Sequence, residues 1–165
     1  MGAANTFRMG FAIASEERFA ALVTAYERIR ACKAAEVWPE KKEEWTAYFD
    51  AKALAHFWWP TAAELEEWKQ RYLSTPYPKR FTDPSLQRPW DFLALFDAFK
   101  HGDYALLPIE RVSASEAFLP FEPFGHPFGG TGCMRALIEA FEHSVTQDED
   151  AVPPQPKRWG RFWRQ

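Results

Sequence analysis

The chain has 165 residues, about the length of one domain, and 47% of them are apolar, which is enough for a single core. Its net charge of −3 gives no general attraction to nucleic-acid phosphates. Because two cysteines cannot make a disulfide scaffold, and neither a secretory signal pattern nor a run of roughly 18 apolar residues occurs, we expect a cytoplasmic protein without a membrane-spanning segment.

The first half of the chain predicts one strand followed by helices. Residues 6–14 are mostly apolar and stop at Ser15, which indicates a strand that leads into a helix N-cap. Apolar residues recur at helical spacing after Ser15 and again in residues 40–57, so two helices are expected there. Thr61 and Glu64 form a capping box, which predicts the start of another helix.

A proline-rich stretch separates these helices from the next one. Residues 74–89 contain four prolines in sixteen residues, so we expect a long surface loop, a kind of segment that often carries function. Pro89 is expected in the first turn of the following helix, and Gly102 at its C-cap.

The remaining residues predict a hairpin and a last helix. The expected hairpin strands are residues 104–113 and 117–123. Pro108 and Pro120 are expected at sheet edges or bulges, because proline lacks the N–H that a strand donates. Residues 134–141 give the last apolar helical face. This order predicts an α+β domain in which about five helices pack on a small antiparallel sheet, made of the N-terminal strand and the hairpin.

Charge divides the chain near its C-terminal end. Residues 101–150 hold nine acids and two bases, whereas residues 151–165 hold four bases and no acid. We expect residues 1–150 to form a single α+β domain, and residues 151–165 to be a Pro-rich linker and a basic, aromatic tail that folds back on the acidic segment. The acidic run at residues 147–150 is expected to be a linker-like surface segment.

The glycine-rich stretch at residues 125–133 raises the question of a phosphate site. Gly125 and Gly130 have the spacing of a Walker loop, but Thr131 stands where that loop needs lysine. The histidines and cysteines show none of the spacings typical of metal ligands. The sequence therefore predicts neither a nucleotide or other cofactor nor a metal.

Cys133 is the residue of this stretch that favours an enzyme. It lies where a helix is expected to begin, and free backbone N–H groups there can lower the pKa of a thiol. His126 would serve as the base if the fold brings it within hydrogen-bond reach, whereas His143 is about 15 Å further along a straight helix. Alternatively, Cys133 is a small buried side chain, and the glycines only permit a tight turn.

Residues 127–141, PFGGTGCMRALIEAF, are similar to small uncharacterised bacterial proteins in which a strand, an aromatic-Gly-Gly turn and an amphipathic helix recur. The acidic character of the chain and its lack of a catalytic constellation also resemble the immunity proteins of bacterial toxin systems. The resemblance implies a protein that binds another protein and offers an acidic surface to a basic toxin.

Our leading hypothesis is a protein-binding module, specifically an immunity protein that neutralises a toxin by electrostatic steering and aromatic anchors. The 8 Trp are too many to bury completely, so some are expected at the contact surface. The candidate contact residues are Trp58, Trp59, Glu122, Asp148, Glu149, Asp150, Arg158, Trp159, Arg161 and Trp163.

Two other functions compete with this hypothesis. The first is a Cys-dependent hydrolase or thiol enzyme that uses Cys133 with His126. The second is a nucleic-acid-associated protein that uses the bases and rings of residues 157–165, although the acidic body argues against phosphate binding. The sequence predicts no membrane partner, and it does not set the oligomeric state.

Overall fold

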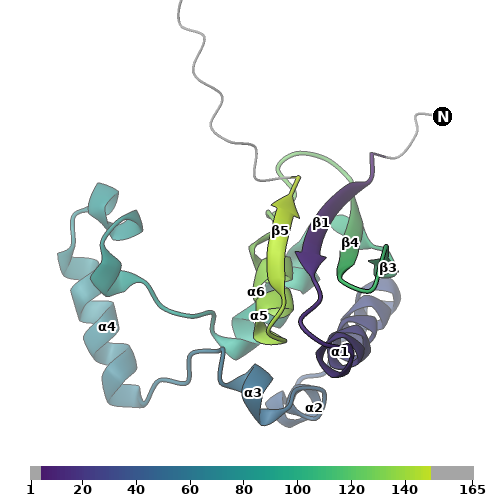
Figure 1. Cartoon of the computed structure of the whole chain (residues 1–165). Coiled ribbons are helices and arrows are strands. Elements are labelled where there is room, and N and C mark those ends of the chain that lie inside the picture. The colour runs from purple at the N-terminus through teal and green to yellow at the C-terminus, as the bar shows by residue number, and fades with distance from the viewer. Residues whose placement is uncertain (1–4, 150–165) are drawn as a thin grey trace, which may run out of the picture.

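The computed structural model describes residues 5–149, which build an antiparallel sheet with helices against one face (Figure 1). The strands follow the order β2-β4-β1-β5, and β3 pairs with β4. The predicted α+β class is confirmed. The strand bounds are β1 (Phe7–Ala12), β2 (Tyr104–Leu106), β3 (Glu110–Arg111), β4 (Glu116–Pro123) and β5 (Ser144–Asp148).

The first helix begins and ends at residues that satisfy its free backbone groups. α1 (Glu16–Ala35) starts after Ser15, whose hydroxyl accepts a hydrogen bond from the Arg18 backbone N–H at 3.2 Å. Glu36 ends the helix in the left-handed region, with φ of 56°. The strand and the N-cap predicted from residues 6–15 are thus confirmed.

The single helix predicted for residues 40–57 is wrong, because two short helices stand in its place. They are α2 (Lys42–Thr46) and α3 (Ala51–Leu54). Asp50 separates them by acting as an N-cap, since its carboxylate accepts a hydrogen bond from a backbone N–H of α3 at 2.9 Å. The apolar spacing of the segment still serves the core, where Trp45 is buried.

The next helix has the capping box that the sequence predicts. In α4 (Ala62–Ser74), the Glu64 N–H donates to the Thr61 hydroxyl at 3.2 Å, and the Thr61 N–H donates to the Glu64 carboxylate at 2.9 Å. No residue of α4 is buried. This helix is therefore held by its caps and local contacts, and not by the core.

The predicted proline-rich loop contains two turns of 3₁₀ helix. These are η1 (Tyr77–Phe81) and η2 (Pro84–Leu86), each with proline in its first positions. α5 (Phe92–His101) follows, and its N-cap is Asp91, whose carboxylate accepts hydrogen bonds from two backbone N–H groups at 3.0 Å. Pro89 lies before this cap, so its predicted place in the first helical turn is wrong.

Gly102 is the C-cap of α5, as predicted, but its backbone is not in the left-handed region, because φ is −63°. The reason for glycine lies in the side chain two residues further on. A Cβ atom at position 102 would lie 2.2 Å from the ring of Tyr104, which is buried. The turn from α5 into β2 thus depends on the absence of a side chain.

Pro120 lies in the central strand β4, opposite Arg8 of β1, so its predicted place at an edge or bulge is wrong. Its carbonyl accepts a hydrogen bond from the Leu107 N–H at 3.1 Å, on the side of β2 and β3. In an antiparallel strand, the N–H and the carbonyl of one residue point to the same neighbouring strand. The missing N–H of Pro120 therefore faces the interruption between β2 and β3, where Pro108 also lies.

The predicted last helix is confirmed, and a strand that the sequence did not predict follows it. α6 (Gly132–Ala140) buries its apolar face. β5 then pairs with β1, with a register shift between Gly10 and Phe11. The acidic run at residues 147–150 therefore begins inside the sheet, and its interpretation as a linker-like segment is wrong for its first two residues.

The core is built largely from aromatic rings, many of which come from the helical segments. Trp45 stacks on Phe96 with ring centroids 4.0 Å apart, and Phe49 meets Phe92 edge-on at 5.1 Å. Alternate residues of β1 and β4 supply the opposite wall. The buried large side chains of these two strands are Met9, Phe11, Leu119 and Phe121.

Gly102→Ala should destabilise the fold, because the added Cβ cannot be accommodated unless the buried Tyr104 ring moves. We expect the free energy of unfolding, measured by urea denaturation, to fall by about 2 kcal/mol or more. Gly125→Ala is the matched control, since nothing lies within 4 Å of a Cβ atom there, and its effect should stay within about 0.5 kcal/mol. Equal stability of the two variants contradicts this role for Gly102.

Candidate functional site

Cys133 lies at the start of α6, as predicted, but its side chain is only 3% exposed. The sulfur lies 3.3 Å from the hydroxyl of Tyr104. Burial raises the pKa of the Cys133 thiol, and this outweighs the contacts with Tyr104 and with backbone N–H groups, which favour the thiolate. The thiol is therefore protonated at neutral pH.

The structure does not bring His126 to Cys133. His126 is exposed in the loop between β4 and α6, and its ring packs against that of Phe128 with centroids 5.2 Å apart. The glycines of the loop provide a turn, since Gly129 and Gly130 have φ of 100° and 80°. The two residues predicted for an enzyme thus form no nucleophile–base pair.

A cavity of about 720 Å³ lies where the C-terminal ends of α1 and α5 meet β2, and Lys33 lines it. The Lys33 ammonium donates to the carbonyls of Phe99 and Gly102, both at 2.7 Å, and lies 4.6 Å from the centre of the Tyr104 ring. Burial lowers the pKa of Lys33. The Lys33 ammonium therefore joins the C-terminal end of α1 to the C-terminal end of α5, where a positive charge suits the helix dipole.

Arg18 joins α1 to two other segments of the chain. Its guanidinium is buried and contacts the carboxylates of Asp50 and Glu142, the latter at 2.9 Å. It also lies 5.4 Å from the centre of the Phe141 ring. These contacts fasten the start of α1 to the N-cap of α3 and to the turn after α6.

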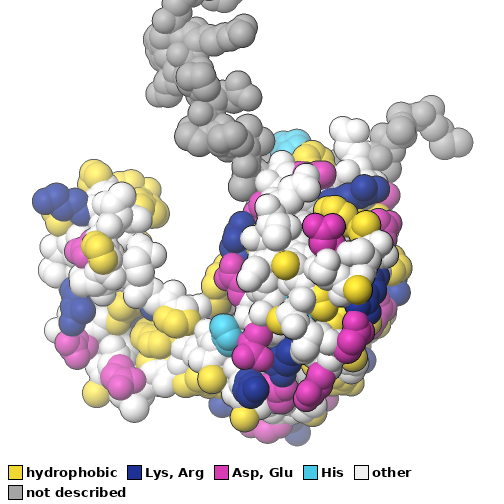
Figure 2. All heavy atoms as spheres, viewed as in Figure 1, with side chains coloured by type: hydrophobic (Ala, Val, Ile, Leu, Met, Phe, Trp, Pro, Cys, Tyr) yellow, Lys and Arg dark blue, Asp and Glu magenta, His cyan; other side chains and the backbone are white. Residues whose placement is uncertain are grey.

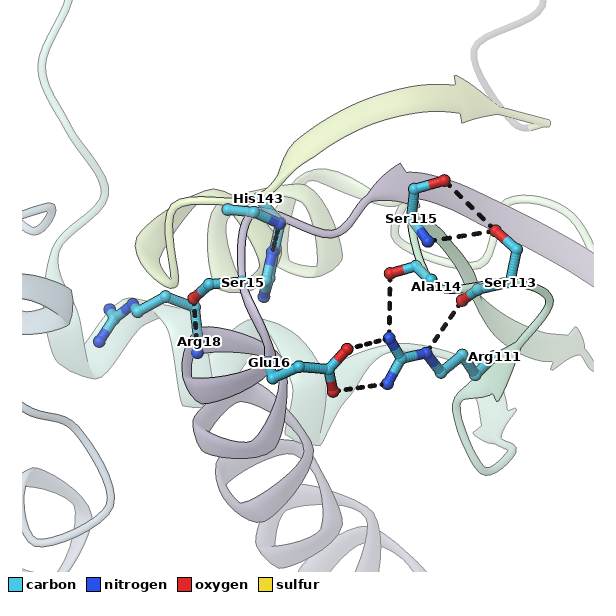
Figure 3. Close-up of polar contacts among 9 residues, drawn as sticks. Ser15, Glu16, Arg18, Arg111, Ser113, Ala114, Ser115 and His143 are labelled. Carbon is cyan, nitrogen blue, oxygen red and sulfur yellow. Dashed lines mark hydrogen bonds and ion pairs between the residues drawn. The ribbon is translucent and has the colours of Figure 1, made fainter.

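His143 is buried beside the start of α1 (Figure 3). Its ring packs against the rings of Phe11 and Phe19, with centroids 5.4 Å and 6.4 Å away. Its Nδ1 accepts a hydrogen bond from the Ala14 N–H at 3.0 Å. Burial lowers the pKa of His143, so the imidazole is neutral in the folded protein at neutral pH. An accepting Nδ1 places the proton of this neutral ring on Nε2.

Arg111 holds the turn between β3 and β4 against the start of α1 (Figure 3). Its guanidinium pairs with both carboxylate oxygens of Glu16 and donates to the carbonyl of Ala114 at 2.9 Å. Glu16 lies in the first helical turn, where a negative charge also suits the helix dipole. Arg111 therefore has a structural role.

Residues 59–90 form an arm that projects from the body of the molecule (Figures 1 and 2). The arm contains α4, η1 and η2, and Leu86 is the single buried residue within it. It leaves and rejoins the body at one place, where the Trp58 N–H donates to the Trp90 carbonyl at 2.8 Å. In the space-filling view, the arm stands clear of the body beyond this base (Figure 2).

Rings and a guanidinium group hold the arm together. The Arg88 guanidinium lies 4.4 Å from the ring centre of Trp58 and 4.7 Å from that of Trp68. Trp68 stacks on Tyr72 at 5.1 Å and donates to the Leu86 carbonyl at 3.1 Å. The arm is thus a small folded unit whose stabilising contacts lie mostly within itself.

Two groups of large apolar side chains are exposed, one at the tip of the arm and one around its base, where Leu93 of α5 belongs to the body. α4 lies between them, and a helix of 13 residues is about 20 Å long. Exposed apolar surface of this kind is a candidate interaction site. The tip patch is Leu73, Tyr77 and Phe81, which are 70%, 68% and 64% exposed. The base patch is Trp59, Trp90 and Leu93, which are 44%, 38% and 45% exposed.

The structure separates the predicted contact residues. Trp58 and Trp59 lie at the base of the arm, and the acidic candidates of the body lie near the ends of strands β4 and β5. Other candidates lie outside the residues that the structure describes, and so does the predicted tail. These are Asp150, Arg158, Trp159, Arg161 and Trp163.

The acidic candidates in the body make contacts within the fold. Asp148 accepts a hydrogen bond at 2.9 Å from the hydroxyl of Thr131, which is buried in the loop before α6. Glu149 accepts one from the Arg8 backbone N–H at 2.7 Å, and Glu122 meets the Thr6 hydroxyl at 3.5 Å. These carboxylates therefore help to position the ends of the strands.

The tip patch is the feature that sequence reasoning missed. The capping box and the apolar stripe of α4 predict a helix but do not say whether anything covers it. A signal was present, because Leu73 lies off the stripe that contains Leu65, Trp68 and Tyr72. An apolar residue off the stripe indicates a second surface of the helix that needs covering.

Comparison with known proteins gives no family for this chain: no family model, no curated protein and no solved structure matches it. Within residues 5–149, no group of three or more His, Cys, Asp or Glu side chains is arranged to hold a metal ion. None of the helices in that range combines the length and the apolarity needed to cross a membrane.

Both cysteines should react slowly with a thiol reagent in the folded protein. Cys32 and Cys133 are 2% and 3% exposed, and burial raises the pKa of both thiols. We expect labelling at neutral pH, followed by absorbance, to be at least about 100-fold slower than in the denatured chain. Fast labelling of Cys133 alone in the folded protein would instead support the enzyme alternative.

The stability of the fold should fall as His143 becomes protonated. Burial lowers the pKa of His143 in the folded state from its ordinary value of 6.5, which the unfolded chain retains. The unfolded state therefore binds the proton first. Stability is complete above pH 6.5 and is lost as the pH drops towards the folded pKa, by up to about 1.4 kcal/mol per pH unit.

Urea denaturation at a series of pH values measures this slope. His143→Asn should flatten it, although the variant has a lower stability at every pH because it leaves space beside the rings of Phe11 and Phe19. His126→Asn is the control at an exposed histidine and should leave the slope unchanged. A slope that is the same in the wild type and in His143→Asn contradicts the assignment.

Proposed function

We propose that the chain is a protein-binding module that docks through the arm and the base patch. The observation that carries this proposal is the tip patch, whose three large apolar side chains are 64% to 70% exposed on a projecting unit with one buried residue. Apolar side chains in this position gain free energy when a partner removes them from water.

The energetics of the arm support a surface that a partner completes. Leu86 is the one buried side chain of residues 59–90, so complete burial of apolar side chains contributes little to the stability of the arm. Burial of the two patches against a partner supplies the apolar contact that the arm lacks by itself.

The residue types of the tip also suit binding. Tyr77 and Phe81 are aromatic side chains that dominate binding energy when a partner pocket encloses them. Lys79 and Arg80 lie between them in the chain and add positive charge. The partner surface that fits the tip is therefore apolar with acidic groups around it.

Neutralisation of a toxin is the finer form of this proposal, and it rests on the charge of the body. Outside the arm, residues 5–58 and 91–149 contain 18 acidic and 11 basic residues. By electrostatic steering, this excess favours a partner that is basic overall and that presents an apolar patch with acidic groups to the tip. An immunity protein that binds a basic toxin fits that distribution of charge.

A photo-crosslinking amino acid in place of Tyr77 should trap a partner in living cells of the native host. We expect a discrete covalent adduct, seen as one band of higher mass and identified by mass spectrometry, because the Tyr77 side chain is 68% exposed at the tip. A basic protein in the adduct, or in a complex with it, would extend the proposal to toxin neutralisation.

The matched control places the same crosslinker at Val112, which is 58% exposed in the turn after β3. This position should give no discrete adduct, because it lies outside both patches. The proposal fails if position 77 gives no adduct, or if positions 77 and 112 give the same set of adducts.

A further inference from the structure

Charge is unevenly distributed along α4. Its first half holds three glutamates and no base, whereas its second half holds Lys69 and Arg71 and no acid. The positive charge continues into the tip at Lys79 and Arg80. Two such helices placed antiparallel bring each acidic half opposite a basic half.

One exposed face of α4 has the spacing that such a pairing needs. Ala62, Glu66, Lys69 and Leu73 follow one another at intervals of four, three and four residues, so they share a face of the helix. All four residues are exposed. The half-buried Trp68 lies on a different face, which packs within the arm.

The two charged residues in the middle of this face are not engaged by other charges. Neither Glu66 nor Lys69 forms an ion pair within residues 5–149, and Glu66 contacts only the Gln70 amide, at 3.4 Å. Glu67 differs, because it pairs with Arg71 of the same helix at 2.9 Å. Glu66 and Lys69 therefore remain available to another molecule.

Resting on the proposed binding function, we infer that the arm docks on the arm of a second copy of this chain, with the two α4 helices antiparallel. In this arrangement Glu66 of each copy faces Lys69 of the other. The tip patch of each copy then reaches the base patch of the other, because the two patches lie at opposite ends of α4.

A second copy fits these features because the surface is complementary to itself. A two-fold axis through the middle of α4 exchanges its acidic and basic halves and its two apolar ends. One symmetric contact therefore pairs the charges and covers both patches in both copies. The second copy brings the glutamates of its α4 and the apolar side chains of its base patch to the positively charged, aromatic tip. It thereby provides the apolar surface with acidic groups that fits the tip.

Sedimentation velocity of the purified full chain, over the micromolar to millimolar range, tests this inference. We expect a reversible dimer. Glu66→Lys and Lys69→Glu should each raise its dissociation constant by about tenfold, because each places like charges opposite one another. The double variant, with both substitutions, should restore dimerisation, since it only reverses the sign of each intermolecular pair.

Two further variants separate the apolar contact from general effects. Tyr77→Ser with Phe81→Ser should weaken the dimer by about 100-fold or more, because it removes both rings of the tip. Val112→Ser, at an exposed apolar residue outside both patches, should leave the dimer unchanged. Far-UV circular dichroism of all variants verifies that α4 stays folded.

The possible outcomes distinguish this inference from the proposed function. A wild-type chain that stays monomeric, but still forms the Tyr77 adduct with another protein in cells, overturns the second copy and leaves the binding function standing. A monomer with no adduct overturns both. If the wild type dimerises but the double charge variant does not, the antiparallel arrangement is overturned.

Discussion

Ring-to-ring packing in the core is the constraint on which the rest of the structure depends. The rings of Trp45 and Phe49 pack on those of Phe92 and Phe96 of α5, and all four belong to the same core as the buried side chains of β1 and β4. This core is complete without α4. α4 therefore projects from the body, and Leu73 at its end is 70% exposed within residues 5–149.

Buried polar side chains in the body serve to join elements. Lys33 joins the ends of α1 and α5, Arg18 joins α1 to the turns around it, and His143 accepts a backbone hydrogen bond at the start of α1. Each of these side chains contacts another element of the fold, although the buried Nε2 of His143 has no hydrogen-bond partner within residues 5–149. The tip patch of the arm remains exposed to solvent.

Local signals made much of the fold predictable, and non-local contacts account for most of what was missed. Ser15 and the capping box of Thr61 predict where their helices begin, because a cap depends on only a few neighbouring residues. Asp50 breaks an apolar spacing that is compatible with one long helix. β5 has the sequence SVTQD, without apolar alternation, and it is a strand because β1 offers an edge for pairing. The exposure of Tyr77 likewise depends on what the body leaves uncovered.

The base of the arm has a consequence for how this protein can change over evolution. Since the chain leaves the body at Trp58 and returns at Trp90 within one hydrogen bond, the whole excursion between them is an insertion at a single point of the body. A gene could lose, lengthen or replace residues 60–89 in one in-frame event, and the core would keep its contacts, including the packing of the Trp59 ring on Phe92. The core and the arm are therefore encoded in separate stretches of sequence, and the two can diverge at different rates.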